Sequence, residues 1–447
     1  MGVLLADSYC GTRLFQGAAA VTTSDLVGLR IKTMRRQRGL SQAQLAHPEL
    51  SDSYVSLIES GKRTPTPAVL ELLAQKLDCS LSYLLNGVTA EQMEDIELAL
   101  GYARLALENG EVHEARTRYA ELLADSNLTG LAAIRQDTEF GLALAAEACG
   151  DLDEAAGILK RLQGEELAPD RQVDVAVALC RVYRHSDMLS EAIAIGEEFL
   201  ARSDRPAWSD GLVELGATLL QAYLYSGDLM RARQFSAEVL NAADMLGTLR
   251  ATVAANWNAA VVAESTGHGE ESLSFAERAL AIQSENGPSR NSARIRVAVA
   301  AMMLRVRPGA VEEARQMLVR ARQELAQTSA GALDRANTEV ELARAEIISG
   351  NYHEAIRHGE AGQALMPSNA RSLEAEAHLL VSRAHGALGD TERAEGSLRA
   401  VRDWLDPLPD SRRVASTWYA AAETAEFLGD TEGSVDAYQR ALACAGL

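Results

Sequence analysis

The 447-residue chain has few cysteines, prolines and aromatic residues, and each scarcity excludes a class of protein. Its five cysteines show no C-x-x-C or Cys/His spacing, so neither a disulfide framework nor a zinc site is expected. Ten prolines and 5% aromatic residues, in a chain rich in alanine, leucine, glutamate and arginine, favour helices. No apolar run approaches the roughly 20 residues that cross a bilayer, and no secretory signal opens the chain. We therefore expect a cytoplasmic, all-α protein with no membrane segment, metal or other cofactor.

Catalytic patterns are missing as well. The sequence has no glycine-rich phosphate loop, no H-E-x-x-H motif and no histidine group at ligand spacing. Its 63 acidic residues are scattered, so no acid/base pair stands out. A binding protein is therefore expected rather than an enzyme.

The net charge of −20 is unevenly distributed. Residues 25–87 hold eight Lys/Arg and six Asp/Glu, a net charge of +2, and residues 1–24 hold one of each. The other 360 residues must therefore carry −22, the difference between −20 and +2. Because an acidic surface repels phosphate, any contact with nucleic acid is expected in residues 25–87.

Residues 25–87 contain the start and stop signals of five short helices. Ser41 and Gln44 form a capping box, and Thr66 precedes a proline at the first position of a later helix. Apolar residues at helical spacing would form one small core: Ile31, Met34, Leu40, Leu45, Val55, Ile58, Leu70, Leu73 and Leu77. Residues 1–24 are expected to be a flexible leader.

The segments Arg38-Gly-Leu-Ser-Gln-x-Gln-Leu-Ala46 and Ser53-Tyr-Val-Ser-x-Ile-Glu-Ser-Gly-Lys-Arg63 resemble the helix-turn-helix (XRE) family of phage repressor and Cro. The resemblance implies a second helix crossing the DNA backbone and a third helix lying in the major groove. By position, it implies base contacts from Asp52, Ser53, Ser56 and Leu57. It implies contacts with the DNA backbone from Arg35, Arg36, Gln42, Lys62 and Arg63. Ser51 and Tyr54, at the start of the third helix, complete the predicted interface.

Two departures from the family pattern leave the identity of the bases open. The turn after the second helix is one residue short and lacks its usual glycine, and the base-facing side lacks Arg, Gln and Asn. For single residues a structural alternative also stays open. Arg35 and Arg36 would then be a solvated helix face, and Tyr54 would be a packing residue.

From Thr89 onward the sequence repeats about every 40 residues. A glycine or aspartate recurs where two helices would meet, and a small residue follows it by five positions. The turn residues are Gly110, Gly150, Asp187, Gly227, Gly267, Gly309, Gly350, Gly389 and Gly429. This pattern predicts about nine helical hairpins in a right-handed α-solenoid over residues 88–447, and it resembles a lengthened tetratricopeptide repeat.

In such repeats the first helix of each hairpin lines the inner face. The family register implies ligand-binding positions at Arg181, Arg184, Gln221, Tyr225, Trp257, Asn258, Arg296, Asn337, Arg344 and Arg383. Amides suit both groups of a peptide backbone, and arginine suits a carboxylate. The alternative is that these residues are solvated, or that they pair with carboxylates of neighbouring helices, as Glu341 would with Arg344.

A helix-turn-helix head joined to a lengthened tetratricopeptide-like solenoid resembles the peptide-pheromone-responsive regulators of Gram-positive bacteria. That resemblance implies a homodimer that binds an inverted-repeat operator in double-stranded DNA, and a solenoid that binds a short signalling peptide or a small acidic effector. A rival interpretation is an intracellular adaptor whose solenoid docks a partner protein, with a head that only localises it.

Overall fold

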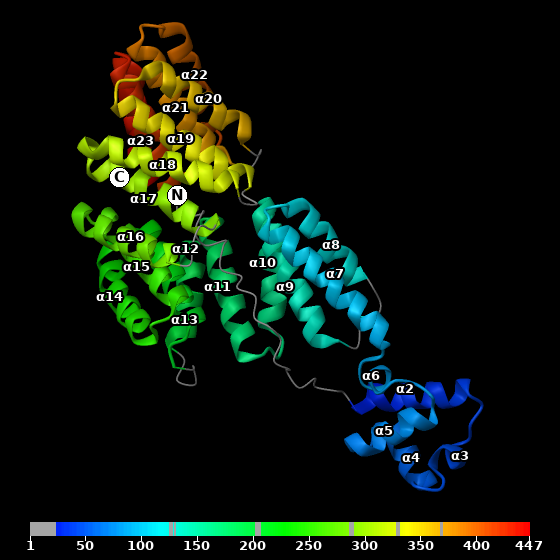
Figure 1. Ribbon diagram of the computed structural model, residues 1–447. Coiled ribbons are helices and arrows are strands. Elements are labelled where there is room, and N and C mark those ends of the chain that lie inside the picture. Colours follow the sequence, from blue (N-terminus) through cyan, green and yellow to red (C-terminus); the bar gives the residue numbers. More distant parts are fainter. Residues whose placement is uncertain are drawn as a thin grey trace. The chain divides into compact units, whose positions relative to one another are not determined.

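The computed structural model describes residues 24–124, 128, 131–201, 207–285, 290–327, 331–366 and 370–447, which form helices and no strand (Figure 1). The predicted leader, residues 1–24, lies outside these residues except for Ser24. Two compact units are present, one within residues 12–168 and the other comprising residues 169–447. Their boundary falls inside the segment predicted as one solenoid, so the first two hairpins group with the head. No helix in the described ranges is long and apolar enough to cross a membrane.

The head is formed by five helices, as predicted. These are α2 (Ser24–Gln37), α3 (Gln42–Ala46), α4 (Asp52–Glu59), α5 (Pro67–Lys76) and α6 (Leu81–Asn86). Three hydroxyl side chains cap helices by accepting backbone hydrogen bonds at the starts of α3, α4 and α5: Ser41, as the sequence predicts, Ser51 and Thr66. All nine predicted core residues belong to one cluster, in which Met34 and Leu40 are partly buried.

A glycine permits the close packing of α2 against α4. A Cβ atom at Gly28 would lie 2.1 Å from the carbonyl oxygen of Ile58. Real Cβ atoms do not approach so closely, so any other residue at this position would push α4 away from α2. The position of α4, the predicted recognition helix, therefore depends on Gly28.

The described residues after the head form nine helical hairpins, as the repeat predicts. The first two, in the smaller unit, are α7 (Ala90–Glu108) with α8 (Val112–Ala124), and α9 (Ala132–Cys149) with α10 (Leu152–Gln163). The third to fifth are α11 (Pro169–His185) with α12 (Leu189–Ala201), α13 (Asp210–Ser226) with α14 (Leu229–Leu246), and α15 (Leu249–Ser265) with α16 (Gly269–Ser284). The last four are α17 (Arg290–Val306) with α18 (Val311–Ala326), α19 (Ala332–Ile348) with α20 (Tyr352–Leu365), α21 (Arg371–Ala387) with α22 (Thr391–Leu405), and α23 (Arg412–Phe427) with α24 (Thr431–Ala445).

The predicted turn residues close eight of the nine hairpins in a left-handed backbone conformation. Gly150 has φ of 91°, and the next residue, Asp151, donates its backbone N–H to the carbonyl of Ala146 at 2.9 Å. Asp187 takes the same conformation with φ of 60°. The prediction is wrong at Gly309, because the sixth hairpin turns through a 3-10 helix, Pro308–Ala310, in which Gly309 has no positive φ.

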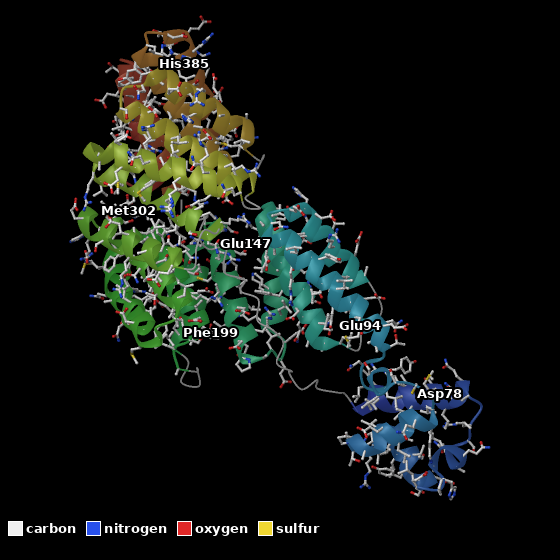
Figure 2. All side chains as sticks on the ribbon, viewed as in Figure 1. Asp78, Glu94, Glu147, Phe199, Met302 and His385 are labelled. Carbon is white, nitrogen blue, oxygen red and sulfur yellow. The ribbon has the colours of Figure 1, made fainter. Side chains whose placement is uncertain are left out.

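The small residues five positions after each turn residue are buried between the paired helices. All nine are at most 5% exposed: Ala115, Ala155, Ala192, Ala232, Ser272, Ala314, Ala355, Ala394 and Ser434. A larger side chain would separate the two helices, so the periodic sequence feature has a packing cause. Met302, labelled in Figure 2, lies in an apolar cluster that joins the fifth to seventh hairpins.

Residues distant in sequence also meet within the larger unit. Helices α13 and α23, five hairpins apart, are in contact. At this contact the guanidinium of Arg413 lies 5.6 Å from the ring centre of Tyr225, and a Cβ atom at Gly227 would lie 2.6 Å from the guanidinium of Arg412. The fourth and ninth hairpins thus approach each other directly.

Candidate nucleic-acid interface and solenoid inner face

Helix α4 has one buried and one exposed side. Val55, Ile58 and Glu59 are buried, because they face the head core. The four residues predicted to meet bases lie together on the exposed side: Asp52, Ser53, Ser56 and Leu57. The hydroxyl of Ser51 accepts the backbone N–H of Tyr54 at 3.2 Å, so Ser51 caps the helix from an exposed position.

Arg35 occupies a different environment from the one expected of a phosphate ligand. Its side chain forms a bidentate ion pair with Glu59, at 2.6 Å from Nε to Oε1 and 3.0 Å from Nη2 to Oε2. Its Nη1 also donates to the carbonyl of Leu40 at 2.7 Å, and the residue is only 9% exposed. The ion pair holds α2 against α4, so Arg35 supports the recognition helix from inside the head. This position corrects the expectation that Arg35 contacts the DNA backbone.

Glu59 is the head residue that sequence analysis missed. Besides Arg35, it accepts a hydrogen bond from Gln42 Nε2 at 2.9 Å, so the Gln42 side chain ties α3 to α4. Burial alone would raise the pKa of Glu59, but the hydrogen bonds from Arg35 and Gln42 lower it below its ordinary value. The carboxylate is therefore charged at neutral pH and joins three helices of the head.

The remaining basic residues of the predicted interface are exposed: Arg36, Lys62 and Arg63. The Arg63 guanidinium lies 5.0 Å from the ring centre of Tyr54, whose partly buried side chain also packs on the head core. Tyr54 therefore has the packing role that the sequence left open. Three exposed cationic side chains and the exposed side of α4 remain as the surface that could meet DNA.

In the larger unit, three of the predicted ligand-binding residues form one hydrogen-bonded chain. Arg184 Nη1 on α11 donates to Gln221 Oε1 on α13, and Gln221 Nε2 donates to Asn258 Oδ1 on α15 at 2.8 Å. All three side chains are buried. The chain crosses three successive hairpins at steps of 37 residues, so the family register correctly groups these positions on neighbouring helices.

Aromatic contacts join further predicted residues of this set. The Tyr225 ring has the Arg184 guanidinium 5.8 Å from its centre, in addition to Arg413 from α23. Arg383 on α21 lies 5.5 Å from the ring centre of Phe427 on α23. Such contacts orient the guanidinium groups along the first helices of the hairpins.

Two further predicted arginines, Arg296 and Arg344, are compensated by internal carboxylates. Arg296 pairs with Glu324 on α18 at 3.2 Å. Arg344 pairs with Glu341 at 3.0 Å and also with Glu376 on α21. Burial alone would lower the pKa of Arg344, but these two carboxylates raise it, so its charge is retained. The sequence left open that these arginines pair with carboxylates of the protein itself, and Arg296 and Arg344 do so. Their charges therefore do not require an acidic ligand.

Trp257 differs from these compensated residues. It is 4% exposed, and its indole Nε1 finds no hydrogen-bond partner among the residues that the structure describes. A buried donor without a partner costs about 1–3 kcal/mol. Arg181 and Asn337 are also buried at their predicted positions on α11 and α19. The Trp257 ring also belongs to the apolar cluster of the fifth to seventh hairpins.

Comparison with known proteins supports the assignment of the head. Residues 31–84 match the family described as "Helix-turn-helix". Over 70 residues the chain is 37% identical to the HTH-type transcriptional regulator PrpR of Mycobacterium tuberculosis and 34% identical to a competence pilus inhibition repressor of Acinetobacter baylyi. Each match covers 15% of this chain, and the matches span 14% and 62% of these relatives, less than two thirds of either.

Most of the chain resembles solved helical structures along nearly their full length. A Rap protein complexed with competence and sporulation factor has a TM-score of 0.54 at 12% identity, over 79% of this chain and 98% of that one. The apo form of the quorum sensor NprR from B. thuringiensis has a TM-score of 0.51 at 15% identity, over 79% and 99%. At this identity the likeness establishes the fold. The chain therefore has an N-terminal helix-turn-helix domain of the XRE type, followed by a solenoid with the tetratricopeptide-like fold of Rap and NprR.

Proposed function

We propose that the protein is a DNA-binding transcriptional regulator that reads double-stranded DNA with its head. The observation that carries this proposal is the exposed side of α4, with Asp52, Ser53, Ser56 and Leu57, in a domain that matches the helix-turn-helix family. Exposed cations lie beside it in sequence, at Lys62 and Arg63. Phosphate contacts would supply most of the affinity, and α4 would supply the sequence preference.

Selection of binding sites from random duplex DNA by the full chain tests this function. Replacing Lys62 and Arg63 with alanine should weaken binding to every sequence and reduce the salt slope by about 0.9 for each phosphate that is no longer neutralised. Replacing Ser53 or Ser56 should instead change the selected sequence. A matched control is Ser416→Ala, since Ser416 is an exposed residue of α23 outside the head. A full chain that selects no sequence would favour the adaptor interpretation.

The solenoid is proposed to bind a short peptide along the first helices of its hairpins. The unpaired indole N–H of Trp257, next to Asn258 on α15, supports a ligand that offers backbone carbonyl groups. The paired state of Arg296 and Arg344 favours such a ligand over a small acidic effector. Peptide binding would shift the equilibrium between arrangements of two heads by no more than its differential affinity for them.

Thermal unfolding of the full chain with pooled short synthetic peptides tests this part of the proposal. A peptide that binds only the folded protein at about 100 times its dissociation constant adds about 2.7 kcal/mol of stability. The shift should be clear in the wild type and reduced by Trp257→Phe, which keeps the ring and removes the donor. Trp404→Phe, a substitution in α22 of the eighth hairpin, serves as the matched control. If no pool stabilises the wild type, or if both variants respond as it does, the inner face is not a peptide sensor.

The regulator is further proposed to act as a homodimer on an inverted-repeat operator. One head reads a half-site, and two heads related by a two-fold axis would read half-sites about one helical turn apart, or a multiple of that distance.

A further inference from the structure

In the larger unit, the first helices of successive hairpins bury residues at the same three positions. These positions form a row that lies 12, 8 and 5 residues before the turn residue of each hairpin, on the side of the first helix that meets a neighbouring hairpin. From the third to the eighth hairpin, every residue of this row is at most 5% exposed. In the third hairpin, for example, the row consists of Val175, Leu179 and Val182 on α11. The row is therefore a stacking surface between hairpins.

In the first hairpin the same row is open to solvent. Its members on α7 are Leu98, Tyr102 and Leu105, which are 56%, 52% and 50% exposed. They are spaced by four and three residues, so they form a single stripe along the helix. The end repeat of a solenoid normally presents a polar outer face to water. An apolar stripe at this place indicates a surface that is covered in the working protein.

We propose that a second copy of the chain covers this stripe, with the two α7 helices packed antiparallel about a two-fold axis. Gly101 lies within the stripe, and a Cβ atom there would meet nothing within 4 Å, so the surface is open at its centre. In an antiparallel pair centred between Gly101 and Tyr102, each tyrosine ring lies over the glycine of the other copy. The same register places Leu98 of one copy against Leu105 of the other, as an isologous interface requires.

The charges of the first hairpin suit the same arrangement. The N-terminal half of α7 carries Glu91, Glu94, Asp95 and Glu97, whereas the C-terminal half carries one acid, Glu108, and one cation, Arg104, which pairs with Asp137 of α9 at 3.1 Å. Arg118 of α8 lies 5.9 Å from the ring centre of Tyr102 and adds a second cation. Antiparallel packing places the acidic N-terminal half of each helix near the C-terminal half of the other, whose two charges balance, whereas parallel packing would place the two acidic halves together.

This inference rests on the proposed function as a dimeric regulator, and it places the dimer interface on α7. The head ends at Gly87 and α7 begins at Ala90, so a contact through α7 joins the two chains directly after their heads. Coupling two heads in this way raises their affinity for two half-sites because the second contact becomes intramolecular.

The test is sedimentation velocity of the full chain at micromolar concentration, followed by DNA binding. Leu98→Glu combined with Leu105→Glu should convert a dimer into a monomer without loss of helical circular dichroism, because both side chains are exposed. It should also weaken binding to the full operator by at least about 100-fold while sparing a half-site. The matched control is Val435→Glu combined with Leu442→Glu on α24, whose side chains are 50% and 52% exposed. That variant should remain dimeric.

A dimer that survives the double substitution on α7, or one that dissociates on the α24 substitution instead, would overturn this surface. A wild-type monomer with and without DNA would overturn it as well. DNA binding is scored separately. A wild type that sediments as an α7-dependent dimer but selects no DNA sequence would support the surface and refute the regulator.

Discussion

Replacing Arg35 with methionine distinguishes its structural role from the phosphate contact that the sequence predicts. The substitution keeps an unbranched apolar stem but removes the guanidinium. The Glu59 carboxylate is then left with one hydrogen bond, from Gln42, and the Leu40 carbonyl is left without the Arg35 donor. Breaking a buried ion pair by removing one partner costs about 3–5 kcal/mol. Because Arg35 and Glu59 are 9% and 7% exposed, near the surface of a small domain, we expect about 2–4 kcal/mol.

Hydrogen exchange of the full chain, followed by mass spectrometry, localises this loss to the head. A destabilisation of about 2–4 kcal/mol should accelerate exchange in α2 and α4 by about 30- to 700-fold if these helices exchange by unfolding of the head. Exchange in α13 and α23 of the larger unit should not change. Removing both partners, as in Arg35→Met with Glu59→Leu, should recover part of the loss because no buried charge is then left unpaired.

Arg36→Met is the matched control, since Arg36 is the exposed neighbour of Arg35 on the same helix. It should leave exchange unchanged and reduce the salt slope of DNA binding. The reasoning fails if Arg35→Met leaves α2 and α4 protected and reduces only the salt slope. Arg35 would then bind phosphate, and the ion pair would not hold α4 in place.

Two further outcomes follow from charge and backbone geometry. Burial by itself would raise the pKa of Glu59. The hydrogen bonds from Arg35 and Gln42 have the larger combined effect, so the pKa lies below its ordinary value of 4.5. The charged Glu59 therefore stabilises the head above about pH 4.5, and this stabilisation is lost as the pH falls through the lowered pKa. Glu59→Gln should be less stable than the wild type at neutral pH. Its hydrogen-exchange protection in the head should then decrease less on acidification. Gly227→Ala should lower the melting temperature more than Gly389→Ala. Their φ angles are similar, 82° and 79°, but only a Cβ atom at Gly227 would meet Arg412. Equal losses by calorimetry would argue against the contact between α13 and α23.

Part of the site could have been read more fully from the sequence. Arg35 lies four residues after Ile31, on the same side of α2 as that core residue, whereas Arg36 is rotated away by about 100°. Glu59 likewise follows Val55 by four positions on the buried side of α4. Two opposite charges on the inner sides of two packed helices indicate an ion pair. This spacing distinguishes Arg35 from Arg36, although the two arginines are adjacent in the sequence.

The features that the sequence alone determined depend on residues a few positions apart. Caps such as Ser41 and Thr66 satisfy backbone groups of their own helix, and each small residue five positions after a turn faces the helix just before it. The repeat of these local rules was enough to predict five head helices and nine hairpins. The same locality explains the one failure, at Gly309, where Pro308 and a 3-10 helix replaced the expected turn.

Only the tertiary structure decided which polar residues are already satisfied. Arginine suits water, a phosphate or a carboxylate, so its sequence position does not reveal its partner. The pairing of Arg344 with Glu376 and the chain through Gln221 depend on how successive hairpins are stacked. The approach of Tyr225 to Arg413 depends on five such steps, and small rotations at each step accumulate. A local sequence pattern specifies each step only approximately, so long-range partners emerge only when the whole stack is formed.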